Sequence, residues 1–364
     1  MTTIQDIFVS LEDRELIDHN KLSNKQNKVL ADIIKCKTKE AGLNVEVCEN
    51  CGEIITHYNS CKNPNCPMCQ GIDRALWVDK QKYYTLNIPY YHIVFTLPDT
   101  LNSLCLLSPG FMYDLLFECA SKTLNELASD DKYLGAKIGF TCVLHTWGQN
   151  LHLHPHLHCI VTSGGLDSNH KWINSKRKNF LFPVKVMSSL FKGKYLALLK
   201  ERFNPPNKEE FQKIIDEAYS KDFVVYIKEP LNNPDSVIEY LGRYTHRIAI
   251  SNARIVSFQN NEVSFRYKDY KDNNTLKIMS LNENEFFRRY MMHILPKSFC
   301  RIRHYGLFSS FNKNERFVAL RELTTTLPKL LPYIRDPIKI LNKLFKTDVR
   351  ICKHCGQFKH PLLE

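Results

Sequence analysis

The sequence predicts an α+β fold, in which an antiparallel sheet carries helices on one face. A small cysteine-rich module is expected before the sheet, and a mainly helical, basic region after it. Three observations support this prediction. They are apolar strand-like runs at residues 89–99, 136–147 and 154–165, an amphipathic helical pattern over residues 110–129, and six of the thirteen cysteines crowded between residues 36 and 69.

The elements divide the chain into three expected segments, 1–85, 86–255 and 256–364. Helical spacing in the first 35 residues indicates one or two lead-in helices before the cysteines. In the second segment, the strand at 154–165 is closed by Gly164 and Gly165, and a basic loop and helix follow over residues 171–203. Residues 233–251 open with Pro234 and Asp235, which are good helix-start residues.

After that helix the pattern alternates again, which suggests a hairpin around Asn260 and Asn261. The remaining residues read as mainly helical and basic. No internal repeat and no low-complexity tract is visible in the sequence.

Charge and length bound the class of protein. A chain of 364 residues with a formal net charge of +12 favours a polyanionic partner, nucleic acid above all, because neutralised phosphates release counterions. No apolar run approaches the roughly 18 residues needed to span a bilayer. The first residues carry acids and lack an apolar core, so no signal peptide is expected and the cytoplasm is the expected compartment.

The cysteine-rich segment predicts structural zinc. Residues 48–69 read CENCGEIITHYNSCKNPNCPMC, and the two CxxC pairs, Cys48 with Cys51 and Cys66 with Cys69, are expected to complete one tetrahedral site. Cys36 and Cys61 are further candidates, either in an exchanged ligand set or for a second ion. The later CKHCG pair, Cys352 and Cys355, is only half a site; His354 and His360 could complete it, or the pair is incidental.

The stretch LHLHPHLHCIVTSGG places four histidines at every second position, and alternate residues of a strand share one face. Because Pro155 fits the start or edge of a strand, His156 and His158 are the securest members, and Leu157, Cys159 and Val161 should lie on the opposite face. His152 and His154 are expected on the approach, exposed. Two imidazoles on one face can bind one ion if a third ligand joins them. If residues 136–147 pair antiparallel with this strand, His145 lies opposite His156; Gln149, nearer the turn, is the second candidate.

EYLGRYTHR, residues 239–247, places Tyr240 and Tyr244 four residues apart, on one face of a helix. Such a pair usually packs in a core or at its rim. A tyrosine beside a bound metal is nevertheless a competent nucleophile toward a phosphodiester. Arg243 and Arg247 lie close by in sequence and could hold phosphate.

These motifs resemble the HUH endonucleases, in which two histidines flank a hydrophobic residue, here His156-Leu157-His158. The tyrosines resemble those of the two-tyrosine branch. The stretches YNSCKNPNCPMCQ, YYHIVFTLP, YLGRYTHRIAIS, FLFPVKVMSSLFKGKY and RIRHYGLFSS are similar to transposases of the insertion-sequence-91 family, in the same order from about residue 15 to 325. Asn63, Pro64 and Asn65 depart from the family, which tends to be more basic there. The family also often continues further after CKHCG.

The resemblance implies an N-terminal zinc-binding domain, an HUH palm and rolling-circle-like transposition. It implies Tyr240 and Tyr244 as nucleophiles that form 5′-phosphotyrosine links, and His156 and His158 as ligands of Mg²⁺ or Mn²⁺. The expected partner is single-stranded DNA at the element's ends, in association with the bacterial nucleoid, with a homodimer left open and no membrane. Basic side chains are the candidates for DNA contact: Lys176, Arg177, Lys178, Arg243, Arg247, Arg301 and Arg303.

Two alternatives to a transposase stay open. A plasmid or phage replication initiator or relaxase shares the chemistry, and a catalytically inactive zinc-dependent regulator would share only the DNA binding.

Overall fold

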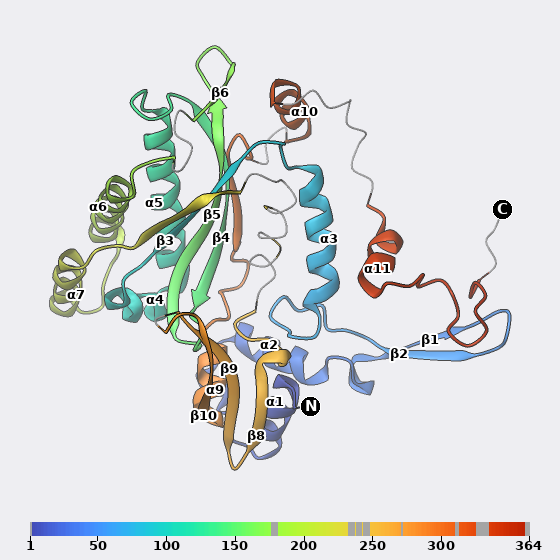
Figure 1. Cartoon of the computed structure of the whole chain (residues 1–364). Helices are drawn as coiled ribbons and strands as arrows, with labels where there is room; N and C mark the ends of the chain where they lie inside the picture. The colour runs from blue at the N-terminus through green and yellow to red at the C-terminus, as the bar shows by residue number, and fades with distance from the viewer. Residues whose placement is uncertain are drawn as a thin grey trace. The chain divides into compact units, whose positions relative to one another are not determined.

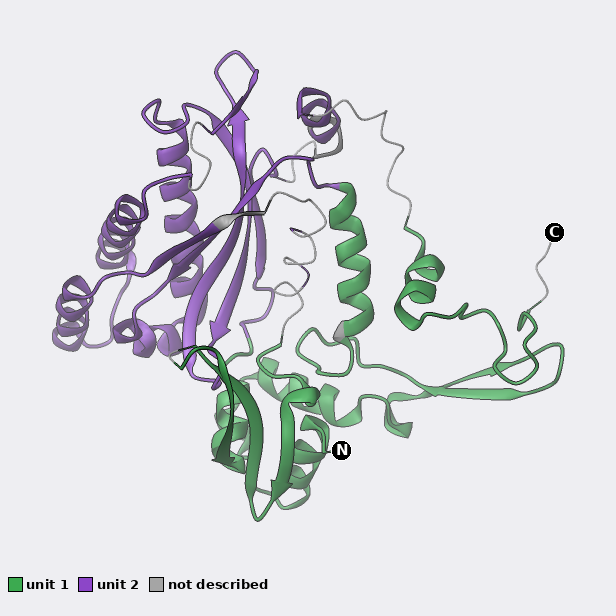
Figure 2. Ribbon diagram, in the orientation of Figure 1, with its two compact units in different colours: residues 1–83, 246–294, 333–364 green, residues 84–245, 295–332 purple. Residues whose placement is uncertain are grey.

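The computed structural model describes residues 2–175, 181–231, 237, 242, 248–270, 272–309, 313–324 and 335–360. Its contacts divide the chain into two compact units (Figure 2). Unit 1 comprises Met1–Tyr83, His246–Ile294 and Tyr333–Glu364, and unit 2 comprises Tyr84–Thr245 and Leu295–Pro332. The sequence suggested three consecutive segments, whereas these units interleave. Residues after 256 divide between both, because some of them pair with strands that are distant in sequence.

Unit 2 is built on a six-stranded sheet in the order β11-β4-β5-β3-β7, with the short β6 paired to β5. All neighbouring strands are antiparallel. The strands are β3 (Tyr90–Thr96), β4 (Lys137–Trp147), β5 (Leu153–Leu166), β6 (Trp172–Asn174), β7 (Val225–Leu231) and β11 (Ile302–Gly306). The predicted α+β class and the central position of the histidine strand, β5, are confirmed (Figure 1).

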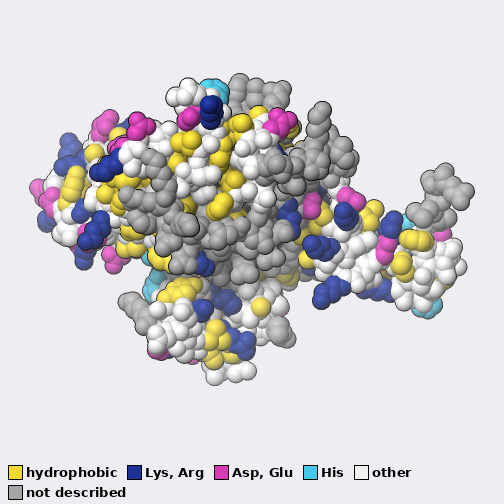
Figure 3. Space-filling model, turned by 45° about the horizontal axis from the view of Figure 1, so that its top comes forward, with side chains coloured by type: hydrophobic (Ala, Val, Ile, Leu, Met, Phe, Trp, Pro, Cys, Tyr) yellow, Lys and Arg dark blue, Asp and Glu magenta, His cyan; other side chains and the backbone are white. Residues whose placement is uncertain are grey.

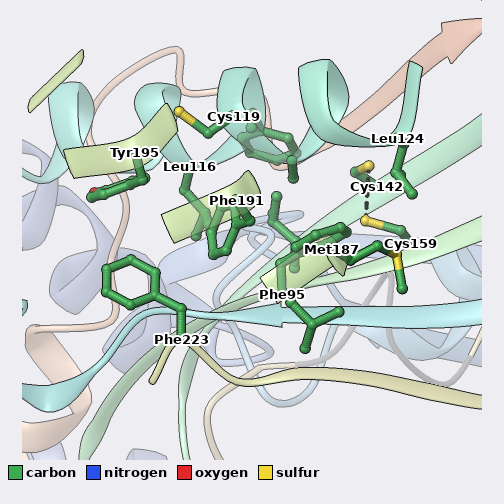
Figure 4. Packing of buried hydrophobic residues seen from close by; sticks show 14 of the residues in the cluster. Phe95, Leu116, Cys119, Leu124, Cys142, Cys159, Met187, Phe191, Tyr195 and Phe223 are labelled. Carbon is green, nitrogen blue, oxygen red and sulfur yellow. Dashed lines mark hydrogen bonds between the residues drawn. The ribbon is translucent and has the colours of Figure 1, made fainter. Parts of the chain in front are cut away.

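Helices cover one face of this sheet (Figure 1). In the described part of unit 2, the elements on this face are η3 (Asp99–Leu101), α4 (Asn102–Leu107), α5 (Pro109–Ser129), α6 (Val184–Arg202) and α7 (Lys208–Ser220). Helix α10 (Lys313–Thr324) also belongs to this unit. Leu157, Cys159 and Val161 of β5 are buried in the core cluster that also contains residues of α5 and α6, on the face that the alternation predicted. Burial of each large apolar side chain contributes about 1.5–3 kcal/mol. In Figure 4, Phe191 lies between Phe95 and Phe223 in this core, and its ring contacts both.

Gly164 and Gly165 near the end of β5 allow close approach of neighbouring backbone. A Cβ on Gly164 would lie 2.3 Å from the carbonyl oxygen of Ile173, and one on Gly165 would lie 2.4 Å from that of Lys137. Any larger residue would therefore push β6 or β4 away from β5. The sequence suggested that the two glycines end the strand, but they lie within β5, which continues to Leu166. At this point β5 pairs with β4 on one side and with β6 on the other.

Unit 1 contains the lead-in helices and a second, three-stranded sheet. Helix α1 (Ile4–Asp13) and helix α2 (Asn24–Lys35) each begin with a capping box, at Thr3 and Ser23. Two short turns, η1 (His19–Lys21) and η2 (Lys39–Ala41), follow them. The one or two helices expected before the cysteines are confirmed.

The second sheet has the order β10-β9-β8, formed by β8 (Ile255–Gln259), β9 (Glu262–Asp269) and β10 (Thr275–Asn282). Turn η4 (Asn252–Arg254) precedes it and α9 (Glu283–Met291) follows. The expected hairpin around Asn260 and Asn261 is confirmed, and both residues have the positive φ that a two-residue hairpin turn requires. Residues 256–364, expected to be mainly helical, thus also contain β9, β10 and β11.

The cysteine-rich part of unit 1 is a two-stranded hairpin, β1 (Leu43–Val47) with β2 (Ile54–Tyr58). Helix α3 (Gln70–Tyr83) follows it in sequence, and α11 (Pro337–Phe345) contacts α3. Among the described residues, no helix is long and apolar enough to cross a bilayer.

Candidate metal centres

Three histidines meet on the sheet face of unit 2 that is opposite to the core helices. His145 of β4 is the register partner of His156 of β5, as the antiparallel pairing predicted. His158 lies two residues further along β5, on the same face. One ligand atom from each of the three rings lies within 4.8 Å of the others. The shortest distance between ring centroids is 4.7 Å, between His145 and His158.

Hydrogen bonds to groups outside this set orient two of the three rings. Nδ1 of His158 lies 2.9 Å from Nε2 of His92 on β3, and Nδ1 of His156 lies 2.6 Å from the carbonyl oxygen of His154. Such outer contacts fix the tautomer and the direction of histidines that ligate metals. Burial and, after it, the positive charge of Lys228 lower the pKa of His92 to about 3, so His92 is neutral.

Exposure changes along the run of four histidines that leads into β5 (Leu153–Leu166). His152 and His154 are exposed, as expected, His156 is half-buried and His158 is buried. The group formed by His145, His156 and His158 is therefore sheltered at one end and open at the other. Among the described residues, this group consists of three imidazoles, and such a set suits a divalent transition metal that keeps positions for outside oxygen atoms. The residues present thus fit a catalytic type of metal site.

The other candidates for this site are placed only in part. Gln149 lies in the turn between β4 and β5, where the Gly148 amide donates to the carbonyl of His152. Tyr240 and Tyr244 lie outside the described residues. So do five of the basic candidates: Lys176, Arg177, Lys178, Arg243 and Arg247.

Arg301 and Arg303, the two remaining basic candidates, are described. Desolvation lowers the pKa of Arg301 to about 10, so its guanidinium remains charged at neutral pH. Arg303 forms an ion pair with Asp114, and its guanidinium lies 4.1 Å from the ring centroid of Phe117 on α5. It therefore points to the helix-covered face, away from the histidines. In the view of Figure 3, described Lys and Arg side chains lie scattered among acidic ones.

The cysteines of unit 1 form two groups. Cys36, Cys61, Cys66 and Cys69 make one, and Cys48 and Cys51 make the other together with Cys352 and Cys355. The sequence predicts one ion among Cys48, Cys51, Cys66 and Cys69, but the structure does not bring these four together. The cause is the hairpin, since five residues of β1 span about 17 Å and carry the first CxxC turn to its far end.

The first group lies at the open end of the hairpin, where β1 begins and β2 ends. The Sγ atom of Cys69 lies 3.3 Å from that of Cys36 and 3.6 Å from that of Cys61. Burial raises the pKa of the Cys66 thiol, and the nearby charges of the other three cysteines raise it further. A cation among the four sulfur atoms would remove this cost of ionisation.

The loop that carries this first group is fixed by polar contacts. The side-chain NH₂ of Asn63 donates to the carboxylate of Asp32 at 2.8 Å, and its side-chain oxygen accepts from the backbone amide of Asn65 at 2.9 Å. The hydroxyl of Tyr290 donates to the carbonyl of Asn65 at 2.6 Å. Asn63 and Asn65, noted in the sequence as departures from a basic pattern, therefore have a structural role in this chain.

Sequence reasoning missed two sets of residues. His92 interrupts the apolar run YYHIVF, and a polar residue in the middle of a buried strand was the available signal. Cys352 and Cys355 were treated as half a site. Their signal was the identical spacing of CENCG and CKHCG, which suggests two halves of one site.

Comparison with known proteins identifies the family. A family model described as "Transposase zinc-binding domain" matches residues 8–97, and one described as "Putative transposase" matches residues 139–316. The chain is 37% identical over 333 residues to "Putative transposase y4qJ" of Sinorhizobium fredii, covering 88% of this chain and 83% of that protein.

A second relative is the "Transposase for insertion sequence element IS801" of Pseudomonas savastanoi pv. phaseolicola. The chain is 27% identical to it over 309 residues, which cover 81% of this chain and 73% of that protein. No solved structure matches the chain significantly. With the zinc-binding module ahead of the transposase domain, and with both relatives aligned over most of their length, the chain belongs to the insertion-sequence-91 family of transposases.

Proposed function

We propose that this transposase nicks and rejoins single-stranded DNA through 5′-phosphotyrosine links to Tyr240 and Tyr244. The observation that carries the proposal is the convergence of His145, His156 and His158 on the sheet face free of the core helices, in a chain of a transposase family. These three residues would bind Mn²⁺ or Mg²⁺. A bound ion would polarise a nonbridging oxygen of the scissile phosphate and stabilise the charge that develops there.

The chain's own residues supply the covalent step. The phenolic oxygen of one tyrosine attacks phosphorus as its proton leaves, and an O–P bond forms. The bond from phosphorus to the 3′ oxygen breaks, and that oxygen takes up a proton to leave a 3′-OH. The phosphotyrosine conserves the energy of the broken bond, so a later 3′-OH can reverse the step on another strand. A second tyrosine allows two such links to exist at once.

Basic side chains near the histidine face would hold the DNA backbone. Lys228 of β7 is exposed and is the register partner of His92, so it lies on that face. Arg243, Arg247 and the segment Lys176–Lys178 join it as proposals from the sequence. Arg303 forms its ion pair with Asp114 on the helix-covered face of the sheet. We therefore do not propose that it contacts DNA.

Zinc has a different role. The family's zinc-binding module contains Cys36, Cys61, Cys66 and Cys69. We assign these four as the ligands of a structural Zn²⁺, because four thiolates close the coordination shell and leave no position for substrate.

The test is covalent capture of DNA. The purified chain is incubated with Mn²⁺ and single-stranded oligonucleotides tiled across the flanks of its gene, and adducts are resolved on a denaturing gel. We expect an adduct that each single variant, Tyr240→Phe or Tyr244→Phe, weakens and that the double variant abolishes. The family assignment favours a transposase over a replication initiator.

Tyr226→Phe is the matched control, because Tyr226 is exposed on the histidine face as the register partner of Val94. If Tyr226→Phe loses the adduct while the Tyr240→Phe/Tyr244→Phe double variant still forms it, neither Tyr240 nor Tyr244 is the nucleophile. No adduct with any oligonucleotide or metal would support the inactive regulator instead.

A further inference from the structure

The turns that carry Cys48 and Cys352 have the same backbone geometry. The amide of Cys48 donates to the carbonyl of Glu53 at 2.9 Å, and the amide of Cys352 donates to that of Gln357 at 2.8 Å. The glycine after each pair donates back to the first cysteine's carbonyl, at 2.8 Å for Gly52 and 2.9 Å for Gly356. Both glycines have positive φ, +74° and +71°, which favours glycine.

The sulfur atoms of the two turns interlock at a spacing suited to a metal. Sγ of Cys48 lies 3.8 Å from Sγ of Cys355, and Sγ of Cys51 lies 3.9 Å from Sγ of Cys352. A tetrahedral ion with bonds of about 2.3 Å to sulfur places its ligands about 3.8 Å apart. A disulfide requires about 2.05 Å, so these pairs are not bonded to one another.

Ordinary packing does not account for the association of these segments. Among residues 43–58 of the hairpin, Cys48 alone has a buried side chain, and among residues 346–360 Cys352 alone does. Val45, Val47 and Ile54 of the hairpin are 57%, 47% and 62% exposed. An isolated two-stranded hairpin is marginal in water, and a segment without an apolar core needs another source of folding energy.

Polar contacts align the two segments without supplying a core. The amide of Glu49 donates to the carbonyl of Lys359 at 3.0 Å, and Nζ of Lys359 lies 2.9 Å from a carboxylate oxygen of Glu46. Asn50 donates to the carbonyl of Phe358. The Lys359–Glu46 pair is partly buried, with side chains 14% and 33% exposed, and a single ion pair near the surface contributes only about 1 kcal/mol.

We infer that Cys48, Cys51, Cys352 and Cys355 bind a second structural Zn²⁺, which joins segments of the chain that are 307 residues apart. Binding displaces the four thiol protons, and the closed set of four sulfur ligands excludes catalysis at this ion. Residues 350–360 are then part of the zinc-binding module, although the family model for that module ends at residue 97. The inference does not depend on the nuclease chemistry proposed above.

The test counts zinc in the full-length protein by atomic emission after dialysis. The variants are made in a His156→Ala/His158→Ala parent, so that the histidine group cannot add to the count, and this parent should hold about two ions per chain. Cys48→Ser/Cys51→Ser, Cys352→Ser/Cys355→Ser and the variant with all four changes should each lose one ion, because all remove the same site. Cys36→Ser/Cys61→Ser should lose the other ion, and its combination with Cys352→Ser/Cys355→Ser should lose both.

Cys300→Ser is the matched control, because Cys300 is exposed and lies outside both groups; it should keep the zinc content of the parent. Cys355→His should retain zinc, since Cys₃His is also a structural ligand set. If Cys352→Ser/Cys355→Ser keeps all its zinc, or if Cys48→Ser/Cys51→Ser loses all of it, the second site does not exist.

Hydrogen exchange gives a readout that does not depend on the amount of zinc. In Cys48→Ser/Cys51→Ser, the peptide covering residues 350–360 should exchange faster than in wild type, although the changes lie about 300 positions away. Exchange in β4 and β5 should be unchanged, which shows that the variant is folded. Unchanged protection of residues 350–360 would overturn the inference.

Discussion

The hydrogen bond between His92 and His158 makes a quantitative prediction about the proposed metal site. His92 is 3% exposed, and its Nε2 lies 2.9 Å from Nδ1 of His158. His92→Ala removes this contact and leaves space beside the ring, so His158 loses part of its fixed orientation. Loss of such an outer contact weakens metal binding by about 10–100-fold, or about 1.4–2.7 kcal/mol. His92 is thus a positioning residue rather than a ligand.

The assay is adduct formation with single-stranded DNA as a function of Mn²⁺ concentration. In His92→Ala the half-saturating Mn²⁺ concentration should rise by about 10–100-fold, while the rate at saturating Mn²⁺ stays close to wild type. His304→Ala is the control. Its Nδ1 lies 2.8 Å from the hydroxyl of Thr141 on the same sheet, outside the histidine group, and its Mn²⁺ dependence should be that of wild type. An unchanged Mn²⁺ dependence in His92→Ala, or a rate that no Mn²⁺ concentration restores in a folded protein, would refute the reasoning.

Three further predictions concern the metal, the sheet and helix α9. Because three imidazoles favour a transition metal over the oxygen-seeking Mg²⁺, Mn²⁺ should support the adduct at a lower concentration than Mg²⁺; equal dependence on both would argue against the histidine set. Gly165→Ala should destabilise unit 2 by about 1–3 kcal/mol in denaturant unfolding, since its Cβ would meet the carbonyl of Lys137. Gly193→Ala, in open space within α6, should stabilise by about 0.5–1 kcal/mol, and the reverse order would contradict the close-approach argument. Ion pairs with Arg288 and Arg289 lower the pKa of Glu285 from 4.5 to about 2, so its contribution is present above about pH 4.5 and is lost as pH falls toward 2. Glu285→Gln should therefore cost up to about 1 kcal/mol at pH 7 and nothing near pH 2, measured by thermal unfolding across pH.

The sequence predicted the central strands of the palm because their facing and their pairing depend on residues that are close in sequence. The alternation of His156, Leu157 and His158 fixed which side chains face the core, and the tight turn after β4 fixed the register that brings His145 opposite His156. Asn260 and Asn261 predicted their hairpin for the same reason, since only their own backbone conformation was needed.

Long-range pairings could not be read in this way. Nothing local in RIRHYG indicates that β11 joins β4, or that this pairing directs Arg303 to the core helices. The ligand sets of the cysteines were equally hidden, because spacing in sequence identifies CxxC turns but does not state which two turns meet. The five-residue strands of the hairpin place Cys48 and Cys66 at opposite ends of a ladder about 17 Å long, so these two CxxC turns do not meet.

The most direct test of the proposed chemistry is the mass of the DNA-linked peptide. Trypsin cuts after Lys228, Arg243 and Arg247, so Tyr240 and Tyr244 fall into different peptides, 229–243 and 244–247. After adduct formation in Mn²⁺ and nuclease trimming, we expect nucleotide mass on these two peptides in wild type and on neither in His156→Ala/His158→Ala. Nucleotide mass on any other peptide, or undiminished labelling in the histidine variant, would contradict the account.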